Sequence, residues 1–486
     1  MKHPVFLLLL LGAIHCPIRA ATASAQDANE QLALHQERAR EAEKRQDFAT
    51  AVREYRLLVN AVPNSAELLS NLGVALYFNR DFKEAVEILR RSETLKPGLY
   101  TPHVFIGLAM TQLGKPDDAV RELEKAVEIN GADPLAHFRL GLVYTAQSRF
   151  DMAAEQMQIA VEEKPDDQEA WFALGRSSLE LAKGATIELL HVAPDGGRTW
   201  ALAGEQYEAQ GRREQAVKAY AGALERRPDL PDVAQKIADL GGTVPATRRG
   251  DGGNDAEEDR LYDLVHVYQA RAAASFERVA QIDPDSFRAH EILGDSYLAA
   301  DRFDDAILEY GKVLERKPDL PGAHRDLCDA LSRTGRIAEA IKECDAEIEV
   351  SPYSADAYVD AARLRAMEDD NVRAAVLVEK ALGLDRPPAA AYKLKGRVDL
   401  AQKHYPAAIE ALRHYLQLEG SDPGAWFLLA RAYKAVGNST MSAQAIESYK
   451  KTSDAEKATR EVQQALQSHD NRDGSSEDEL REGSPL

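Results

Sequence analysis

A small residue recurs every 34 residues along this chain, and this period constrains the fold more than any other feature of the sequence. The recurring residue is an alanine in two series, which are Ala51, Ala85, Ala119 and Ala153, and then Ala306, Ala340, Ala374 and Ala408. A second small residue lies twelve positions before each alanine, and a proline often lies twelve positions after it. Small residues allow close helix approach and proline ends a helix, so each period predicts one antiparallel helix pair.

The residues within each period resemble the tetratricopeptide repeat family. The fullest matches to the family pattern are Trp200-Gly204-Tyr207-Gly211-Ala216-Tyr220-Ala223-Pro228 and Leu72-Gly73-Tyr77-Ala85-Pro97. The resemblance covers roughly residues 30 to 465 and therefore nearly the whole chain. It implies an all-α fold, a right-handed α-solenoid of antiparallel helix pairs. It also implies a chain that is not an enzyme and needs no cofactor.

The register breaks in the middle of the chain. When the recurrent alanine is position 20 of each repeat, twelve repeats follow, and the fifth (168–196) and seventh (258–286) are only 29 residues long. We expect each of them to be a shortened helix pair. After the sixth repeat another first helix begins and stops at Gly241-Gly242. The Gly-rich, charged stretch that follows has no apolar period and predicts a hinge, the central interruption of the solenoid.

These breaks predict six segments. They are a signal peptide (1–25), an N-terminal arm (27–242), a linker (243–255), a C-terminal arm (256–452), a capping helix (453–468) and a disordered acidic tail (469–486).

The N-terminus is typical of an export signal. Lys2 and His3 precede a short apolar run, and small-residue cleavage sites follow, the second of which ends at Ala25. We therefore expect an exported protein, periplasmic or extracellular, without an integral membrane segment in the mature chain. Cys16 raises the alternative of a lipid anchor, which the bulky His15 directly before it disfavours.

Charge and cysteine content exclude some classes of function. The net charge of −20 argues against a general nucleic-acid or anionic-membrane binder. If position 8 of a repeat faces position 20, then position 4 faces position 24, and His324, Cys328 and Cys344 converge. A metal-dependent enzyme using these three residues is an unfavoured alternative, because a buried cysteine is ordinary core packing. The same geometry offsets the two cysteines by about one helical turn, so we expect no disulfide.

In the family, positions 2, 5, 9, 12 and 13 of each first helix line a concave groove that binds peptides. We call these positions the groove face. Repeats two to four place apolar residues there, including Tyr77, Phe78 and Phe138. Repeats five to eight are mixed in charge, with Glu169, Glu291 and Asp295 beside Arg176 and Arg288. Repeats nine to twelve are basic, with Arg325, Arg333, Arg363, Lys393, Arg397, Arg431 and Lys434, and also carry Phe427.

The zones of the groove face predict the function. A basic segment in an acidic protein suits a partner with an acidic segment, and the apolar zone suits an aromatic one. We therefore expect a protein-binding scaffold without metal or nucleic acid. An alternative is a non-catalytic accessory subunit of a cell-envelope system, such as polysaccharide synthesis or export, or outer-membrane assembly. The carboxylate clamp of some family members does not carry over, because Arg397 stands where that clamp has Asn.

Overall fold

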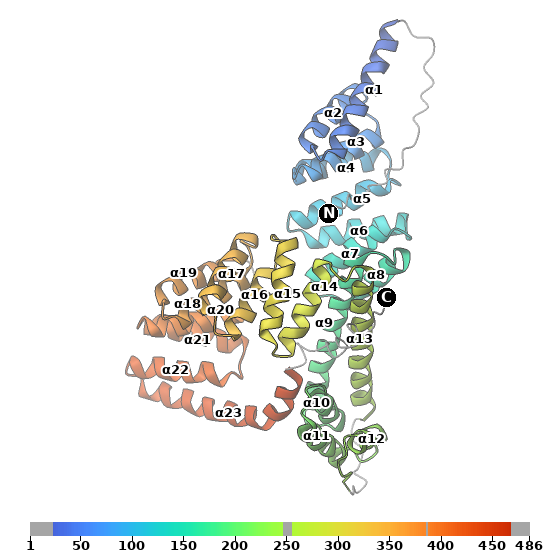
Figure 1. Cartoon of the computed structure of the whole chain (residues 1–486). Helices are drawn as coiled ribbons and strands as arrows, with labels where there is room; N and C mark the ends of the chain where they lie inside the picture. Colours follow the sequence, from blue (N-terminus) through green and yellow to red (C-terminus); the bar gives the residue numbers. More distant parts are fainter. Residues whose placement is uncertain (1–22, 246–254, 385–386, 468–486) are drawn as a thin grey trace. The chain divides into compact units, whose positions relative to one another are not determined.

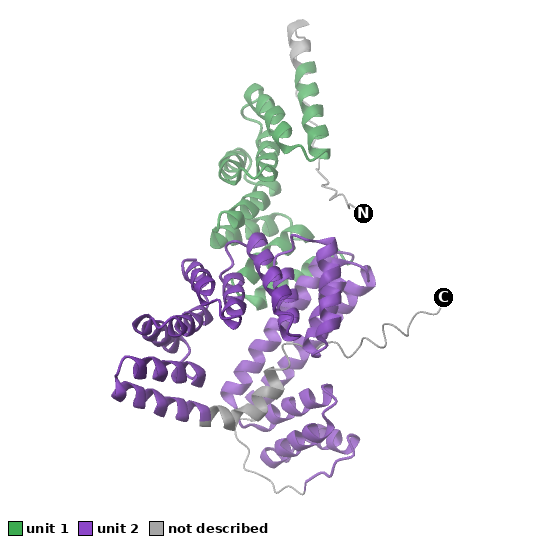
Figure 2. Cartoon of the chain, turned by 60° about the vertical axis from the view of Figure 1, so that its left-hand side comes forward, with its two compact units in different colours: residues 1–165 green, residues 166–486 purple. Residues whose placement is uncertain are grey.

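The computed structural model describes residues 23–245, 255–384 and 387–467 (Figure 1). These described residues form 23 α-helices and no β-strand. The chain divides into two compact units, residues 1–165 and 166–486, which Figure 2 shows in green and purple. The predicted signal peptide up to residue 22, the linker from 246 to 254 and the tail from 468 lie outside the described residues.

Unit 1 consists of four consecutive helix pairs. Its helices are α1 (Ala23–Lys44), α2 (Phe48–Ala61), α3 (Ala66–Phe78), α4 (Phe82–Leu95), α5 (Tyr100–Gln112), α6 (Pro116–Ile129), α7 (Pro134–Ala146) and α8 (Phe150–Glu163). Side-chain oxygens of Asp47, Ser65 and Asp133 accept a hydrogen bond from the backbone N–H three residues later and so cap α2, α3 and α7. These caps begin helices where the 34-residue register predicts them.

Unit 2 continues the pattern after a different start. Its helices are α9 (Gln168–Val192), α10 (Gly197–Ala209), α11 (Arg213–Arg226), α12 (Pro231–Asp239), α13 (Asp255–Ile282), α14 (Phe287–Ala299), α15 (Phe303–Arg316), α16 (Ala323–Arg333), α17 (Ile337–Val350), α18 (Ala355–Met367), α19 (Asn371–Leu382), α20 (Ala389–Ala401), α21 (Tyr405–Leu418), α22 (Pro423–Ala435) and α23 (Ser439–Gln467). From α14 to α22, first and second helices alternate. The expected all-α solenoid of helix pairs is confirmed.

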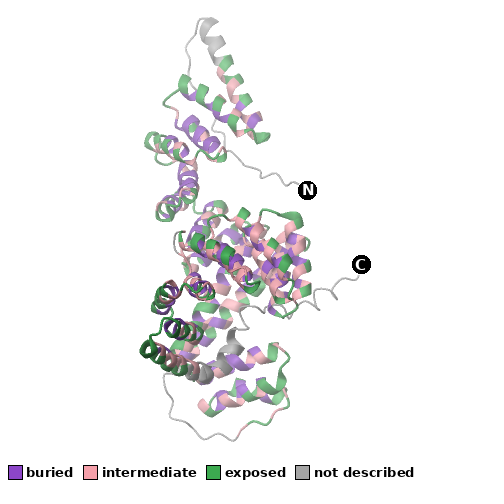
Figure 3. Ribbon diagram, turned by 90° about the vertical axis from the view of Figure 1, so that its left-hand side faces the viewer, coloured by how far each residue is buried: buried purple, intermediate pink, exposed green. Residues whose placement is uncertain are grey.

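Position 8 of the first helix packs against position 24 of the second. A Cβ added to Gly73 would collide with the side chain of Leu89, and one added to Gly294 would collide with Tyr310. The same relation holds at Gly107, Gly141, Gly204 and Gly396. Leu89 and Tyr310 are fully buried, and Figure 3 shows buried residues alternating with intermediate and exposed ones along the paired helices. Each such large side chain contributes about 1.5–3 kcal/mol through burial. Position 8 also meets position 20, as expected: a Cβ added to Gly107 would lie 3.2 Å from the backbone oxygen of Ala119, and Oγ of Ser442 donates to the backbone oxygen of Ala430 at 2.9 Å.

In several repeats the residue at position 4 of the first helix forms a hydrogen bond with the residue at position 23 of the second helix, which we call the 4–23 bond. Nδ1 of His103 lies 2.9 Å from Oε2 of Glu122, and Nδ1 of His290 lies 2.6 Å from Oε2 of Glu309. The same relation joins His35 to Glu54, His137 to Gln156 and His324 to Glu343. A polar bond beside the apolar contact thus fixes the pairing register of these repeats.

The prediction that Cys328 and Cys344 form no disulfide is wrong. These residues occupy positions 8 and 24 of one repeat, 16 residues apart, and form a disulfide between α16 and α17. Their Cα atoms are 5.5 Å apart, which is within the range that a disulfide needs. The mistaken expectation came from treating position 8 as the partner of position 20 alone, whereas position 8 contacts both position 20 and position 24, as Gly107 contacts Ala119 and Leu123.

The two short repeats are not helix pairs. Residues 168–192 form one 25-residue helix, α9, and residues 255–282 form one 28-residue helix, α13. These two long helices pack antiparallel against each other and lie side by side in Figure 1. Nε of Arg271 donates to Oγ of Ser178 at 2.8 Å, and an added Cβ on Gly175 would collide with Phe276. The first half of α9 and the last half of α13 therefore make one repeat.

The segment between α9 and α13 forms a helical branch. The far halves of the two long helices and α10, α11 and α12 share one apolar cluster, which includes Leu189, Tyr220, Ile237 and Leu261. Residues on both sides of the expected linker thus belong to one core. The linker connects α12 to α13 at the branch and does not divide unit 2 into two arms.

The last helix also differs from the expectation. Residues 439–467 form one 29-residue helix, α23, which pairs with α22. A separate capping helix beginning at residue 453 is therefore absent from the described chain. No described helix is both long enough and apolar enough to span a membrane.

Candidate functional site: the groove face

Three arginines stand at position 9 of three consecutive repeats. Arg363 lies on α18, Arg397 on α20 and Arg431 on α22. These helices contact one another directly, α18 against α20 and α20 against α22. Arg363 is half-buried, whereas Arg397 and Arg431 are exposed. Because they share one position of the repeat, the three arginines form a row on the groove face, which we call the arginine ladder.

Carboxylates of the chain neutralise little of the arginine ladder. Nη2 of Arg363 donates to Oδ1 of Asp360 at 3.3 Å. Among the residues that the structure describes, Arg397 and Arg431 form no ion pair. Loss of water contact and then the positive charge of Arg363 lower the pKa of Arg397. The ladder therefore presents positive charges that repel one another, and among the described residues only Arg363 has a carboxylate partner.

The other predicted cations divide into paired and unpaired residues. Nζ of Lys393 lies 2.6 Å from Oδ2 of Asp422, and Arg333 lies 3.6 Å from Asp329. Within the described ranges, half-buried Arg325 and exposed Lys434 have no ion-pair partner. The basic zone thus extends beyond the ladder, but Lys393 serves a contact within the chain.

One predicted aromatic residue remains exposed beside the ladder. The Phe427 side chain on α22 is 44% exposed, and its ring centroid lies 5.7 Å from that of Tyr449 on α23. Phe427 and Arg431 are four residues apart on one helix and so lie on the same side of it. An apolar surface therefore adjoins the last arginine of the ladder.

Ion pairs occupy the mixed zone of the groove face. Nη1 of Arg176 on α9 lies 3.0 Å from Oδ2 of Asp295 on α14. Arg288 lies 2.7 Å from Glu169 and 2.7 Å from Glu291. These contacts join α9 to α14, so this zone contributes to packing between repeats.

Sequence reasoning does not single out Asp326, because its position 6 lies outside the groove-face pattern. Loss of water contact and then the negative charge of Asp295 raise the pKa of Asp326 to about 8. Loss of water contact likewise raises the pKa of Glu291. Asp326 is therefore a carboxyl group that is largely protonated at neutral pH. The raised pKa of Asp326 becomes apparent only when the structure shows that α14 and α16 lie close together.

The apolar zone is built mainly into the core of unit 1. Tyr77 is half-buried and contacts Phe82 and Phe105, with centroid distances of 5.6 and 5.5 Å. Phe78 is 39% exposed and stacks on Phe48 at 5.0 Å. Phe138 is half-buried beside Arg139. The binding role of these aromatic residues stays a prediction, because each also serves packing between helices.

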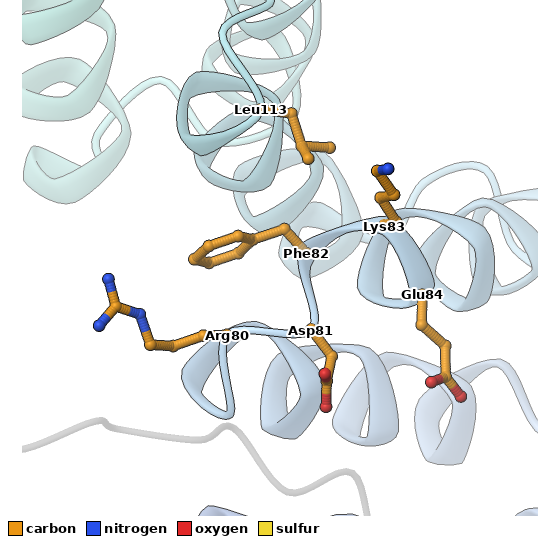
Figure 4. Close-up of a pocket in the computed structure, with 6 residues that line it drawn as sticks. All are labelled: Arg80, Asp81, Phe82, Lys83, Glu84 and Leu113. Carbon is orange, nitrogen blue, oxygen red and sulfur yellow. The ribbon is translucent and has the colours of Figure 1, made fainter. Parts of the chain in front are cut away.

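A shallow pocket of about 380 Å³ lies at one end of this zone (Figure 4). Arg80, Asp81, Phe82, Lys83 and Glu84 line it from the α3–α4 turn and the first turn of α4, and Leu113 lines it from the end of α5. Glu84 already pairs with Arg56 on the neighbouring helix. The lining contains no serine, threonine, cysteine or histidine.

The described residues hold one set of three possible metal ligands within 4.8 Å, namely Glu93, His103 and Glu122. Arg90 lies 2.9 Å from Glu93 and 2.8 Å from Glu122, so a cation already neutralises both carboxylates. The contact between His103 and Glu122 is the 4–23 bond of this repeat, and Arg90 adds ion pairs to it. These contacts explain the cluster better than a metal site does.

The convergence expected of His324, Cys328 and Cys344 is also corrected. The cysteines bond to each other, and Nδ1 of His324 lies 2.7 Å from Oε2 of Glu343. His324 occupies the position that bonds position 23 in other repeats. A disulfide leaves no thiolate for a metal ion, so this alternative has no ligand set.

Comparison with known proteins identifies the repeat. The profile of the tetratricopeptide repeat (TPR) family matches residues 37–99, 107–167, 143–185, 197–230, 270–321 and 297–347.

Two characterised proteins show similarity over part of the chain. The heat shock protein sti1 homolog of Schizosaccharomyces pombe is 28% identical over 171 residues, which are 32% of this chain and 28% of that protein. Kinesin light chain-related 3 of Arabidopsis thaliana is 28% identical over 233 residues, 41% of this chain and 34% of that protein. The chain thus spans about a third of the length of either relative.

Solved structures are similar at lower identity. The Cut9–Hcn1 hetero-tetramer of the APC/C is 15% identical, with a TM-score of 0.35, and the match covers 90% of this chain and 96% of that one. A TPR protein of Thermus thermophilus is also 15% identical, with a TM-score of 0.34, and the match covers 55% and 98% of the two chains.

Proposed function

Because this chain belongs to the tetratricopeptide repeat family, we propose that it is an exported scaffold that binds protein partners through its groove face. Repeats of this family support interactions between proteins. The scaffold itself contributes no catalysis. It holds an extended segment of a partner, and acidic or aromatic side chains of that segment contact the basic and apolar zones.

The observation that carries the proposal is the exposed surface formed by Phe427, Arg431 and Lys434 on α22. The 8–24 contact uses a different side of each first helix for packing within the pair. The groove face of α22 remains open and combines a large apolar side chain with unpaired cations. Aromatic and arginine side chains are the residue types that contribute most to protein interfaces.

Two features support export. The first 25 residues have the charged start, apolar run and small-residue cleavage sites of a secretory signal. The disulfide between Cys328 and Cys344 is an independent observation, because such bonds persist in oxidising compartments and are rare in the cytosol. Both features favour a location in the periplasm or outside the cell.

A differential capture experiment tests the scaffold proposal. The variant Phe427→Ser/Lys434→Ser alters the groove face, and Val376→Ser/Arg373→Ser alters exposed residues of the second helix α19 as a matched control. We expect extracts of the source cell envelope to yield partners that wild type and the control retain and the groove-face variant loses. Equal retention by both variants would contradict binding through the groove face.

A further inference from the structure

The arginine ladder repeats with the period of the fold itself. Arg363, Arg397 and Arg431 are each 34 residues apart, and their helices contact one another in series. First helices of adjacent repeats pack with axes about 8–10 Å apart, so the guanidinium groups recur at a similar interval. A ligand that meets all three arginines must present its own charges at this interval.

The chain itself leaves the ladder without sufficient counter-charge. Arg363 has one carboxylate partner, Asp360, and the described residues supply none for Arg397 or Arg431. Like charges on neighbouring helices destabilise one another, so arginines in this arrangement gain from any carboxylate placed between them. A row of three guanidinium groups, two of them without a carboxylate partner among the described residues, is therefore prepared to bind an anionic ligand.

We propose that the arginine ladder binds an acidic segment of a partner protein in the extended polyproline II conformation, with a carboxylate at every third residue. This inference rests on the proposed scaffold function and specifies the partner of the same face. A polyproline II segment rises about 9 Å per turn of three residues, so every third side chain points the same way at about the interval between adjacent first helices. Successive carboxylates then meet Arg363, Arg397 and Arg431, each through paired N–H donors.

The end of the ladder adds a second element of recognition. Phe427 is exposed and lies one helical turn from Arg431 on α22. A large apolar side chain next to the third carboxylate would cover it. The ligand motif therefore has three spaced acids followed by an apolar residue.

The surroundings of the ladder favour a peptide over a nucleic acid. Asp360 and Asp422 lie beside the basic residues, and the chain carries a net charge of −20. A continuous phosphate backbone would bring negative charge against these carboxylates as well as against the arginines. A peptide with discrete, spaced carboxylates places its charges only where the arginines are.

Peptides of fixed composition test this register. Three fluorescent ten-residue peptides end in Phe and otherwise contain Gly and Ser. The spaced Glu peptide has Glu at positions 1, 4 and 7, and the clustered Glu peptide has Glu at positions 1, 2 and 3. The Lys peptide has Lys at positions 1, 4 and 7. We expect the purified protein to bind the spaced Glu peptide about tenfold more tightly than the clustered one, measured by fluorescence anisotropy at low salt. The Lys peptide should not bind.

Variants connect the binding to the ladder. Arg397→Glu should weaken binding of the spaced Glu peptide at least about tenfold, because it replaces an attraction by a repulsion. Arg373→Glu reverses an arginine on α19 that is 71% exposed and should leave binding unchanged. Circular dichroism of both variants checks that they fold.

The result that overturns the proposal is equal affinity for the spaced and clustered Glu peptides, or equal loss of affinity in the two variants. Either result indicates general electrostatic attraction without a register. The scaffold proposal would then still stand if Phe427→Ser/Lys434→Ser loses captured partners, so the two failures are distinguishable.

Discussion

Gly175 on α9 packs against Phe276 on α13 in the same way that Gly73 packs against Leu89 within a single repeat. The contact identifies α13 as the second helix of the repeat that α9 begins. The helical branch of α10, α11 and α12 is therefore an insertion between the two helices of one repeat. The repeat itself is complete, although its halves lie far apart in the sequence.

Replacing Gly175 by Ala tests this pairing. The added Cβ collides with the Phe276 ring, so we expect Gly175→Ala to lower the free energy of unfolding of unit 2 by about 1–3 kcal/mol. Gly184→Ala, in the same helix, is the control, because its added Cβ meets no atom and alanine favours the helix by about 0.5–1 kcal/mol. Thermal denaturation should shift in opposite directions for the two variants. Similar shifts would contradict the pairing of α9 with α13.

The disulfide between Cys328 and Cys344 should stabilise the ninth repeat. Closing a loop of this length stabilises a protein by about 3 kcal/mol, so Cys328→Ala/Cys344→Ala should lower the melting temperature. A reductant should lower the melting temperature of wild type and leave that of the double variant unchanged. Peptide mapping without reduction should yield the linked pair. Full alkylation of both cysteines in the unreduced, denatured protein would refute the bond.

The raised pKa of Asp326 predicts a dependence of stability on pH. The pKa is about 8 in the folded chain and about 3.9 in an unfolded one, so the folded state retains a proton that the unfolded state loses. The Asp326 carboxyl group therefore favours the folded state most below pH 4. Its contribution to the free energy of unfolding is lost progressively as the pH rises to 8.

The variant Asp326→Asn removes this effect. We expect it to be more stable than wild type by about 1–3 kcal/mol at pH 8, with the difference vanishing toward pH 4. Calorimetry at pH 5 and pH 8 measures the trend. Asp329→Asn, in the same helix, removes a carboxylate paired with Arg333 and should show no such gain. A constant difference between Asp326→Asn and wild type at both pH values would disprove the assignment.

The 4–23 bond should contribute to stability where it is buried. His290→Ala leaves the buried Glu309 carboxylate without its histidine partner, and we expect a loss of about 2–4 kcal/mol. His404→Ala is a matched control, because the His404 side chain is 64% exposed, and it should change stability by less than about 0.5 kcal/mol. Denaturant titration measures both, and a cost at His290 no greater than at His404 would count against this role.

The regular part of the fold follows from the sequence because its cause is local. Small residues at positions 8 and 20 recur in the 34-residue periods, so helix pairs are readable without tertiary information. The sequence does not reveal that position 8 meets position 24 as well as position 20, because both positions lie on one side of the second helix and fit the same apolar pattern. The contact between positions 8 and 24 brings Cys328 and Cys344 together.

The pairing of α9 with α13 was beyond sequence reasoning for a different reason. Each helix carries repeat-like residues in one half only, and a 29-residue spacing resembles a shortened repeat. The partner of Gly175 is the distant Phe276, and no local pattern joins the two. The arginine ladder was readable because its period is that of the fold, whereas Asp326 depends on the neighbouring Asp295 and was not.

The insertion of the helical branch also affects the order in which the chain folds. A growing chain completes α3 with α4, and α5 with α6, as soon as each second helix is made. The first half of α9 must wait until the chain has reached the end of α13 at Ile282. Doubling a loop costs only about 0.6 kcal/mol in closure entropy, so the delay affects the folding rate more than the final stability. The α9–α13 pair is thus where co-translational folding changes from local closure to closure over a long segment.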